Sequence, residues 1–237
     1  MSNLYFQDPS FEFETRALLG NLHYGCGDIG EVTTTIAGIE DGSASDWVAQ
    51  WRGLATRVEA IADEALAHGH RVSARGAYLR AAVYFAAAQV FVDGIEEADD
   101  ALKALFASHR HCFDTHVGLL DSPATHVAIP YEGGSLPGYL FVPVEDGQAR
   151  PTIILCNGSD GAVTSLWPGL AHRLSIAGTA RWSSTGPANR ACCSIATCHF
   201  VPTGNTSLPR SWTSWWSGQR STPRSWQSTG SARVATG

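Results

Sequence analysis

The stretch Pro151-Thr-Ile-Ile-Leu-Cys-Asn-Gly-Ser-Asp-Gly161 decides the fold of this chain. Its first part, Thr152 to Cys156, is a short and mostly apolar run, which is typical of a buried strand in a mostly parallel sheet. A tight polar loop follows, and Trp167 to Ile176 then has the pattern of a helix. A strand, a glycine-bearing loop and a helix in this order open a βα unit, so the sequence predicts an α/β fold.

The loop consists of Asn157, Gly158, Ser159, Asp160 and Gly161. At the carboxyl end of such a strand, free backbone N–H groups can meet a ligand or an oxyanion. A simple βα turn without chemistry explains the same residues equally well. Asp160 either positions the loop or caps the following helix, and the cap is slightly favoured.

Upstream of this unit, residues 43 to 119 have the periodicity of helices. Ser43 with Asp46 three residues later predicts the start of the first helix, and Gly69 predicts its end. Apolar residues at mostly three- and four-residue spacing are expected on one face of this helix: Trp47, Trp51, Leu54, Val58, Ile61 and Leu66.

Further helices are predicted before the spacing of apolar residues changes to the period of two that is typical of strands. Ser73 is expected to cap a helix from Ala74 to about Val92, whose alanines permit close packing against other helices. Another helix is predicted from Glu96 to Ser108, with a shorter one before Leu120. From His126 the residues alternate with a period of two and turn at residues 131–134, which predicts a β-hairpin.

Several of these stretches together resemble one branch of the α/β-hydrolases. They are Trp47…Trp51, Gly69-His-Arg-Val-Ser-Ala-Arg75, Ala77-Tyr-Leu-Arg-Ala-Ala-Val-Tyr84, Ile129-Pro-Tyr-Glu-Gly-Gly-Ser-Leu-Pro-Gly-Tyr-Leu140 and Pro151 to Gly161. The branch has an N-terminal helical domain and includes 2,6-dihydroxypseudooxynicotine hydrolase and the hydrolases that shorten pigment polyketides. The likeness covers about residues 5 to 178 and then stops.

The resemblance implies three parts in the chain. Residues 1–120 would be a helical domain that covers the site and is a candidate surface for a homodimer. Residues 121–178 would hold the first strands and the oxyanion loop of an incomplete α/β-hydrolase domain, with N–H groups around Ser159 and Asp160 as the oxyanion donors. Residues 179–237 are expected to be irregular or disordered.

The same resemblance implies a Ser-His-Asp hydrolase with no cofactor and no metal. Its substrate would be a small-molecule carbonyl compound, cleaved at a C–C bond next to a ketone or at an ester, with an aromatic or polyketide-like body. Ser159 is not the expected nucleophile, because it lacks the G-x-S-x-G setting in which that serine stands.

The composition changes abruptly after Asp160. No Asp or Glu occurs from Gly161 to Gly237, and that stretch holds six of the eight tryptophans. Ordinary domains contain about an eighth of acidic residues throughout. Residues 179 to 237 follow no hydrophobic period and offer no core.

A shifted reading frame explains this tail. New codons can be formed from the third base of each codon and the first two bases of the next. They allow A-L-V-F-D-G-P-G-Q from Ala180 and V-Y-G-V-S-Q-G-G-Y from Gln227. These are the strand, the loop and the nucleophile elbow that an α/β-hydrolase has next. The sequence therefore predicts a frame slip near Thr179, no catalytic residue in the chain as written, and an inactive product.

Two alternatives assume that residues 179–237 are translated in the correct frame. Arginines interleaved with tryptophans after Gly178 could form a disordered basic segment that stacks on single-stranded nucleic acid, but such a segment usually also carries lysines and a supporting fold. The other is an ordinary disordered tail. The alternative function is a non-catalytic helical interaction module with a basic, Trp-rich tail that could bind nucleic acid. Neither nucleic acid nor a membrane is the favoured partner.

The individual polar residues of the helical region are expected to have structural rather than catalytic roles. Arg75 and Arg80 are expected to pair with acids inside that region, and His126 to be structural. Surface or packing roles are expected for the remaining histidines considered, which are His68, His70, His109, His111 and His116. The six cysteines lack metal-ligand spacing and are expected to be free thiols in a reducing compartment.

The N-terminus lacks the pattern of a signal peptide, and no apolar run approaches the ~18 residues that span a bilayer, so a cytoplasmic protein is expected. Asn3 to Gln7 resembles a viral-protease recognition site. It lacks the leading Glu and the following Gly or Ser of that site, and we interpret it as native sequence.

Overall fold

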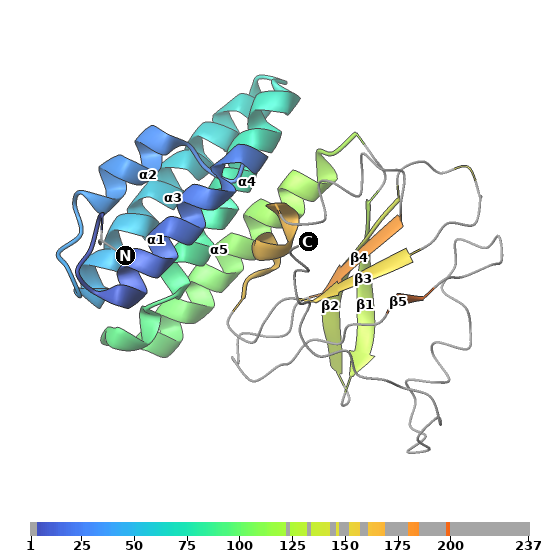
Figure 1. The fold of residues 1–237 in the computed structure, drawn as a ribbon. Helices are drawn as coiled ribbons and strands as arrows, with labels where there is room; N and C mark the ends of the chain where they lie inside the picture. The colour runs from blue at the N-terminus through green and yellow to red at the C-terminus, as the bar shows by residue number, and fades with distance from the viewer. Residues whose placement is uncertain are drawn as a thin grey trace, which may run out of the picture.

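A bundle of helices lies beside a small β-sheet in the computed structural model of the chain (Figure 1). The structure describes residues 4–121, 124–131, 134–142, 146, 152–156, 161–168, 180–184 and 198–199. Within this part of the chain, no helix combines the length and the apolar character that crossing a membrane requires.

The bundle contains five α-helices and two short 3₁₀ helices within residues 9–118. The elements are α1 (Pro9–Asn21), η1 (Leu22–Tyr24), α2 (Ile29–Ile36), α3 (Ala44–Ala67), α4 (Arg71–Gln89), η2 (Val92–Gly94) and α5 (Ala98–Gly118). Helix α4 packs between α3 and α5.

Helix α3 forms as its sequence predicts. Ser43 is the N-cap, and its hydroxyl accepts a hydrogen bond from the Asp46 N–H at 3.3 Å. Gly69, with φ of 76°, reverses the chain after the helix. The predicted apolar face is buried except at Leu66, which is partly buried, and at Ile61, which is 54% exposed. Ala62 takes its place on the buried face, because it continues the spacing of three and four from Val58.

The next two helices differ from the prediction in their bounds. Helix α4 begins at Arg71 with His70 as its N-cap, so Ser73 lies inside the helix rather than at its start. The chain reverses at Gly69 and α4 begins two residues later. No loop therefore extends to Ser73, and this serine is not the N-cap. Helix α5 is one continuous helix, not two, because no Gly or Pro interrupts it between Ala98 and Val117.

An N-terminal arm, residues 4–8, is held by two carboxylates. The N–H groups of residues 4 to 6 donate to Glu12 at 3.0–3.1 Å. Those of residues 7 and 8 donate to Asp41 at 2.8 and 3.0 Å. These bonds, the one from the Leu4 N–H most of all, lower the pKa of Glu12 to about 2. The arm thereby places Phe6, 3% exposed, in the core.

The sheet begins with the predicted hairpin. Strand β1 (Ala124–Tyr131) pairs antiparallel with β2 (Gly134–Phe141), and Tyr131 faces Gly134 across the turn. Strand β3 (Thr152–Cys156) has the predicted bounds. The strand order is β1-β2-β4-β3-β5, and β3 with β4 is the single parallel pair among the described strands.

The prediction for residues 179–237 was wrong at two places. Irregular chain was expected after about residue 178, but Ala180–Ser184 forms β4 and Cys198–His199 forms β5. Strand pairing uses backbone N–H and C=O groups, which every one of these residues supplies whatever its side chain. Of the helix expected over residues 167–176, only the first two residues are described.

Candidate functional site

The candidate site lies at the carboxyl end of β3. Of the five predicted oxyanion-loop residues, Asn157, Gly158, Ser159 and Asp160 lie outside the described residues, and Gly161 is described and partly buried. The 3₁₀ helix η3 (Val163–Ser165) follows at once. The two ends of the loop are therefore fixed by β3 on one side and by η3 on the other.

The segment after the loop is anchored on the helical domain. Val163, Thr164 and Trp167 are 1%, 4% and 5% exposed. Helix η3 packs against α4, and Figure 1 shows it in gold beside α5. Contact with the helices thus determines where the loop ends in space.

A cluster of five rings, which we call the aromatic seam, joins α5 to the sheet. It comprises Phe113 and His116 from α5, Tyr139 and Phe141 from β2, and Trp167. The ring centroids of Phe113 and Tyr139 are 5.2 Å apart. Those of His116 and Trp167 are 4.9 Å apart and those of Phe141 and Trp167 5.7 Å apart. Edge-to-face geometry dominates, which is the favourable arrangement for such pairs.

A polar contact reinforces the seam. The Tyr139 hydroxyl donates to Oδ1 of Asp114, and the Arg110 guanidinium lies 3.5 Å from the same oxygen. Arg110 also lies 5.2 Å from the centroid of the Tyr139 ring, within the range of a cation–π contact. Burial raises the pKa of the Tyr139 hydroxyl, which therefore stays a protonated donor. We call these three residues the α5–β2 clasp.

Two histidines bind α5 to α4. Nδ1 of His109 lies 2.9 Å from the Ala82 carbonyl oxygen, and Nδ1 of His116 lies 2.9 Å from that of Arg75. A carbonyl oxygen only accepts, so Nδ1 carries the proton in both rings. Burial lowers the pKa of each histidine to about 4, so both are neutral at pH 7. The predicted packing role is confirmed for these two.

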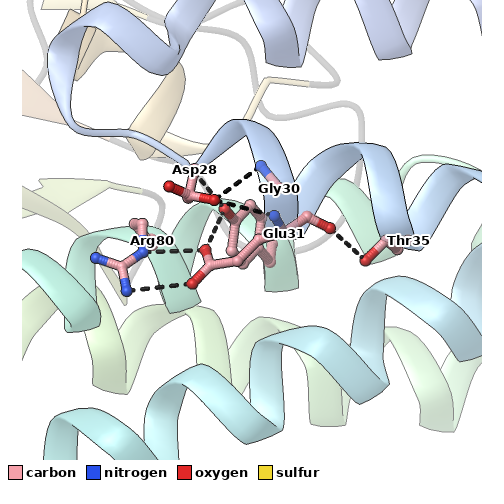
Figure 2. Close-up of polar contacts among 6 residues, drawn as sticks. Asp28, Gly30, Glu31, Thr35 and Arg80 are labelled. Atoms are coloured by element: carbon pink, nitrogen blue, oxygen red, sulfur yellow. Dashed lines mark hydrogen bonds and ion pairs between the residues drawn. The ribbon is translucent and has the colours of Figure 1, made fainter.

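Arg80 pairs with an acid inside the helical domain as predicted, whereas Arg75 pairs with Asp121, just after that domain. Arg75 binds Asp121 at 2.5 Å. Figure 2 shows Arg80 donating to both oxygens of Glu31, at 3.0 and 3.3 Å. The Tyr84 hydroxyl donates to the same carboxylate at 2.7 Å. The contacts of Arg80 and Tyr84 join α4 to α2, so they stabilise the helical domain and are not part of the loop region.

The remaining candidates give no catalytic group among the described residues. His68, His70 and His111 are exposed, and His126 on β1 packs its ring 5.0 Å from that of Tyr139. Within the described ranges, no three His, Cys, Asp or Glu side chains lie close enough together to hold a metal ion.

Two of the six cysteines have described side chains. Cys26 and Cys112 are buried free thiols. Burial raises the pKa of Cys26 to about 12 and raises that of Cys112 as well, so neither thiol forms a nucleophilic thiolate at neutral pH.

The sequence did not predict the seam or the clasp. One signal was present: Arg110 and Asp114 stand four residues apart, and Phe113 and His116 three, which places each pair on one side of a helix. Both pairs fall in the shorter helix that was predicted before Leu120, but nothing local identifies the sheet residues that they contact.

No protein-family model matches the chain. It is 36% identical over 162 residues to the alpha/beta hydrolase xenA of Xenoacremonium sinensis, a match that covers 66% of this chain and 37% of that protein. It is 32% identical over 166 residues to the 20-hydroxy-prefusarin hydrolase FUS2 of Gibberella moniliformis, covering 68% of this chain and 39% of that protein.

Among solved structures, that of 2,6-dihydroxy-pseudo-oxynicotine hydrolase has a similar fold. The TM-score is 0.58 at 21% identity, over 71% of this chain and 45% of the other. The chain thus spans less than half the length of the relatives that it matches.

Proposed function

Since the chain belongs to the α/β-hydrolases, in a branch with an N-terminal helical domain, we propose that its gene encodes a serine hydrolase and that this chain is an inactive, frame-shifted product. The substrate is a small aromatic or polyketide-like carbonyl compound, cleaved at a C–C bond next to a ketone or at an ester. The name of the 20-hydroxy-prefusarin hydrolase, a similar protein, supports a substrate of this class.

The observation that carries the proposal is the place of β4. This strand pairs with β2 on one side and β3 on the other, so it is central in the described sheet. A central strand beside a parallel neighbour is typically an apolar run. The residues here are Ala180-Arg-Trp-Ser-Ser184, whereas the shifted frame allows A-L-V-F-D from the same codons. The residues that the shifted frame allows fit a central strand better than the written residues 180–184 do.

The reaction needs a serine on a strand-to-helix turn, a histidine as base and then acid, and an aspartate that orients the histidine. The loop at residues 157–161 would supply backbone N–H donors to the oxyanion, and losing one such donor costs about 10²-fold or more in rate. The written sequence contains no G-x-S-x-G motif, so it provides the loop without the nucleophile.

The test begins with the nucleotide sequence around codon 179, where we expect a missing base. A gene with that base restored should yield a protein that a fluorophosphonate probe labels and that hydrolyses aryl esters or cleaves aryl ketones. Alanine in place of the serine in the restored G-V-S-Q-G should abolish both. Strong labelling of the written chain would contradict the proposal, and strongly salt-dependent binding of single-stranded DNA would favour the basic-tail alternative.

The helical domain is also the proposed homodimer surface. Large apolar side chains are exposed on it: Leu4 is 70%, Phe13 68% and Val72 71% exposed. Light scattering of the full chain should give twice the monomer mass, and Phe13→Ser should reduce it if this surface forms the contact.

A further inference from the structure

The segment that leaves the candidate site is short and is held by local hydrogen bonds. Ala162 follows Gly161, the last residue of the predicted oxyanion loop. The carbonyl oxygen of Ala162 accepts two hydrogen bonds from Ser165, from its N–H at 3.0 Å and from its hydroxyl at 2.7 Å. Val163, the first residue of η3, is buried. The place of Gly161 is therefore set by whatever holds η3 and the residues just after it.

Trp167, which ends this segment, packs among three rings of the aromatic seam. Its side chain is buried, and its ring centroid lies 4.9 Å from that of His116 and 6.1 Å from that of Phe113. Both contacts are edge-to-face, with 90° and 81° between the planes, which is a favourable geometry. Phe141 of β2 lies 5.7 Å away. Rings from a helix and from a strand thus hold the indole together.

The two rings from α5 are themselves fixed. The Nδ1–H of His116 donates to the Arg75 carbonyl of α4 at 2.9 Å. The Phe113 ring packs on that of Tyr139, whose hydroxyl donates to Asp114. Since a close-packed interior transmits displacement rather than absorbing it, the helices determine where Trp167 lies.

The position of an oxyanion loop matters more than that of most loops. Its N–H groups stabilise the transition state only when they lie within hydrogen-bond distance of the place where the charge develops. A misplacement of about 1 Å can cost on the order of 10²-fold in rate. One end of this loop is held by β3, and the other end at Gly161 depends on the segment that Trp167 anchors.

We propose that Trp167 is the positioning residue of the oxyanion loop: through its contacts with His116 and Phe113 it fixes Gly161 and with it the end of the loop. The catalytic consequence rests on the proposed hydrolase function, whereas the anchoring does not. The helical domain thereby contributes to the rate of the reaction and not only to access to the site.

The anchoring is tested in the full chain as written. Carbonyl-¹³C glycine with ¹⁵N alanine labels the two Gly-Ala peptide bonds of the sequence, Gly161–Ala162 and Gly76–Ala77. In the wild type, the N–H order parameter of Ala162 should be about 0.85, as in rigid backbone, and in Trp167→Ala it should fall below about 0.6. Ala77 lies inside α4 and should remain rigid in both, which also shows that the variant is folded. If it is not folded, Trp167→Leu replaces it with the same expectations.

The catalytic consequence is measured in the frame-restored protein. Losing an interaction made only in the transition state lowers kcat and leaves KM unchanged. Trp167→Ala should therefore reduce kcat for ester hydrolysis by at least about tenfold and change KM by less than about twofold. Trp167→Phe retains a ring for the edge contacts and should recover most of the rate. The control is Val58→Ala, a buried position on α3 outside the seam, which should leave kcat unchanged.

The outcomes separate the two proposals. An Ala162 order parameter that stays high in Trp167→Ala would overturn the anchoring. A change in KM alone, or a loss of kcat no larger than that in Val58→Ala, would overturn the positioning role and leave Trp167 a packing residue. If no fluorophosphonate labelled the frame-restored protein, the proposed function would fail and the effect on rate with it, while Ala162 in the written chain would still decide the anchoring.

Discussion

The helical domain and the sheet differ in how their parts are brought together. In the helical domain, packing joins elements that follow one another along the chain: Trp51 on α3 contacts Tyr84 on α4, and Trp47 on α3 contacts Phe91 just after α4. In the sheet, β2 and β3 are separated by β4, a strand from later in the chain. The helical core is therefore robust to changes after residue 178, whereas the sheet depends on them.

The largest effect should come from breaking the helical core. Trp47 is fully buried, donates its indole N–H to the Ala87 carbonyl at 2.8 Å and contacts the Phe11 ring at 4.8 Å. Trp47→Ala should reduce the free energy of unfolding by about 3–5 kcal/mol, measured by urea denaturation followed at 222 nm. Glu64→Ala, at an exposed position on the same helix, is the control and should change it by less than about 0.5 kcal/mol.

Acid should weaken the contact between α4 and α5 next. Burial lowers the pKa values of His109 and His116 to about 4 in the folded chain, from the ordinary value of 6.5. The unfolded chain therefore binds more protons between these values, and stability falls as pH is lowered from 6.5 to 4, by on the order of 3 kcal/mol for each histidine. Urea midpoints at pH 7, 5.5 and 4 measure the slope.

His109→Phe separates this effect from that of the carboxylates. The slope between pH 6.5 and 4 should become smaller in the variant. Glu12, whose pKa is about 2, contributes stability that is lost only below about pH 4.5 and should be unaffected. An unchanged slope in the variant would show that the pKa of His109 is not lowered in the folded chain.

A smaller effect is expected at the junction of the two regions. Asp114→Asn weakens the clasp, because the amide is a poorer acceptor for Tyr139 and has no charge for Arg110. We expect a loss of about 1–3 kcal/mol in the free energy of unfolding and an altered near-ultraviolet signal from Tyr139 and Trp167. If only the helical signal changed, the clasp would not be what holds α5 to the sheet.

The smallest effect should be at the surface of α5. Lys103 lies 3.2 Å from Asp100, but the two side chains are 73% and 83% exposed. Lys103→Ala should change the free energy of unfolding by less than about 0.5 kcal/mol, since solvent screens such pairs. This variant is the baseline against which Asp114→Asn on the same helix is judged.

The sequence predicted the elements whose signals are local. Ser43, Gly69 and the spacing between them fixed α3, and the glycines after Tyr131 fixed the hairpin turn. The bounds of α5 were missed because polar residues from Ser108 to His111 look like a helix end, although two of them are held by α4 or the clasp. Strand β4 was missed because its side chains carry no strand signal and only its backbone pairing places it.

At the candidate site, the sequence predicted strand β3 before the loop but neither η3 after it nor what anchors η3, and the oxyanion role of the loop stays a prediction. Nothing local to Trp167 indicates that it meets His116, which is fifty-one positions earlier in the chain. Contacts of that kind depend on how α5 crosses the sheet, and a single sequence does not encode that angle in any short pattern.

The N-terminal arm has a consequence for proteolysis. Residues 4 to 7 read Leu-Tyr-Phe-Gln, most of a viral protease's recognition sequence, and a protease reads its substrate as an extended strand with free backbone groups. Here the N–H groups of all four residues are bound by Glu12 and Asp41, and the Phe6 ring is inserted in the core. Cleavage there requires the arm to detach first, so its rate would report how often this end of the molecule opens.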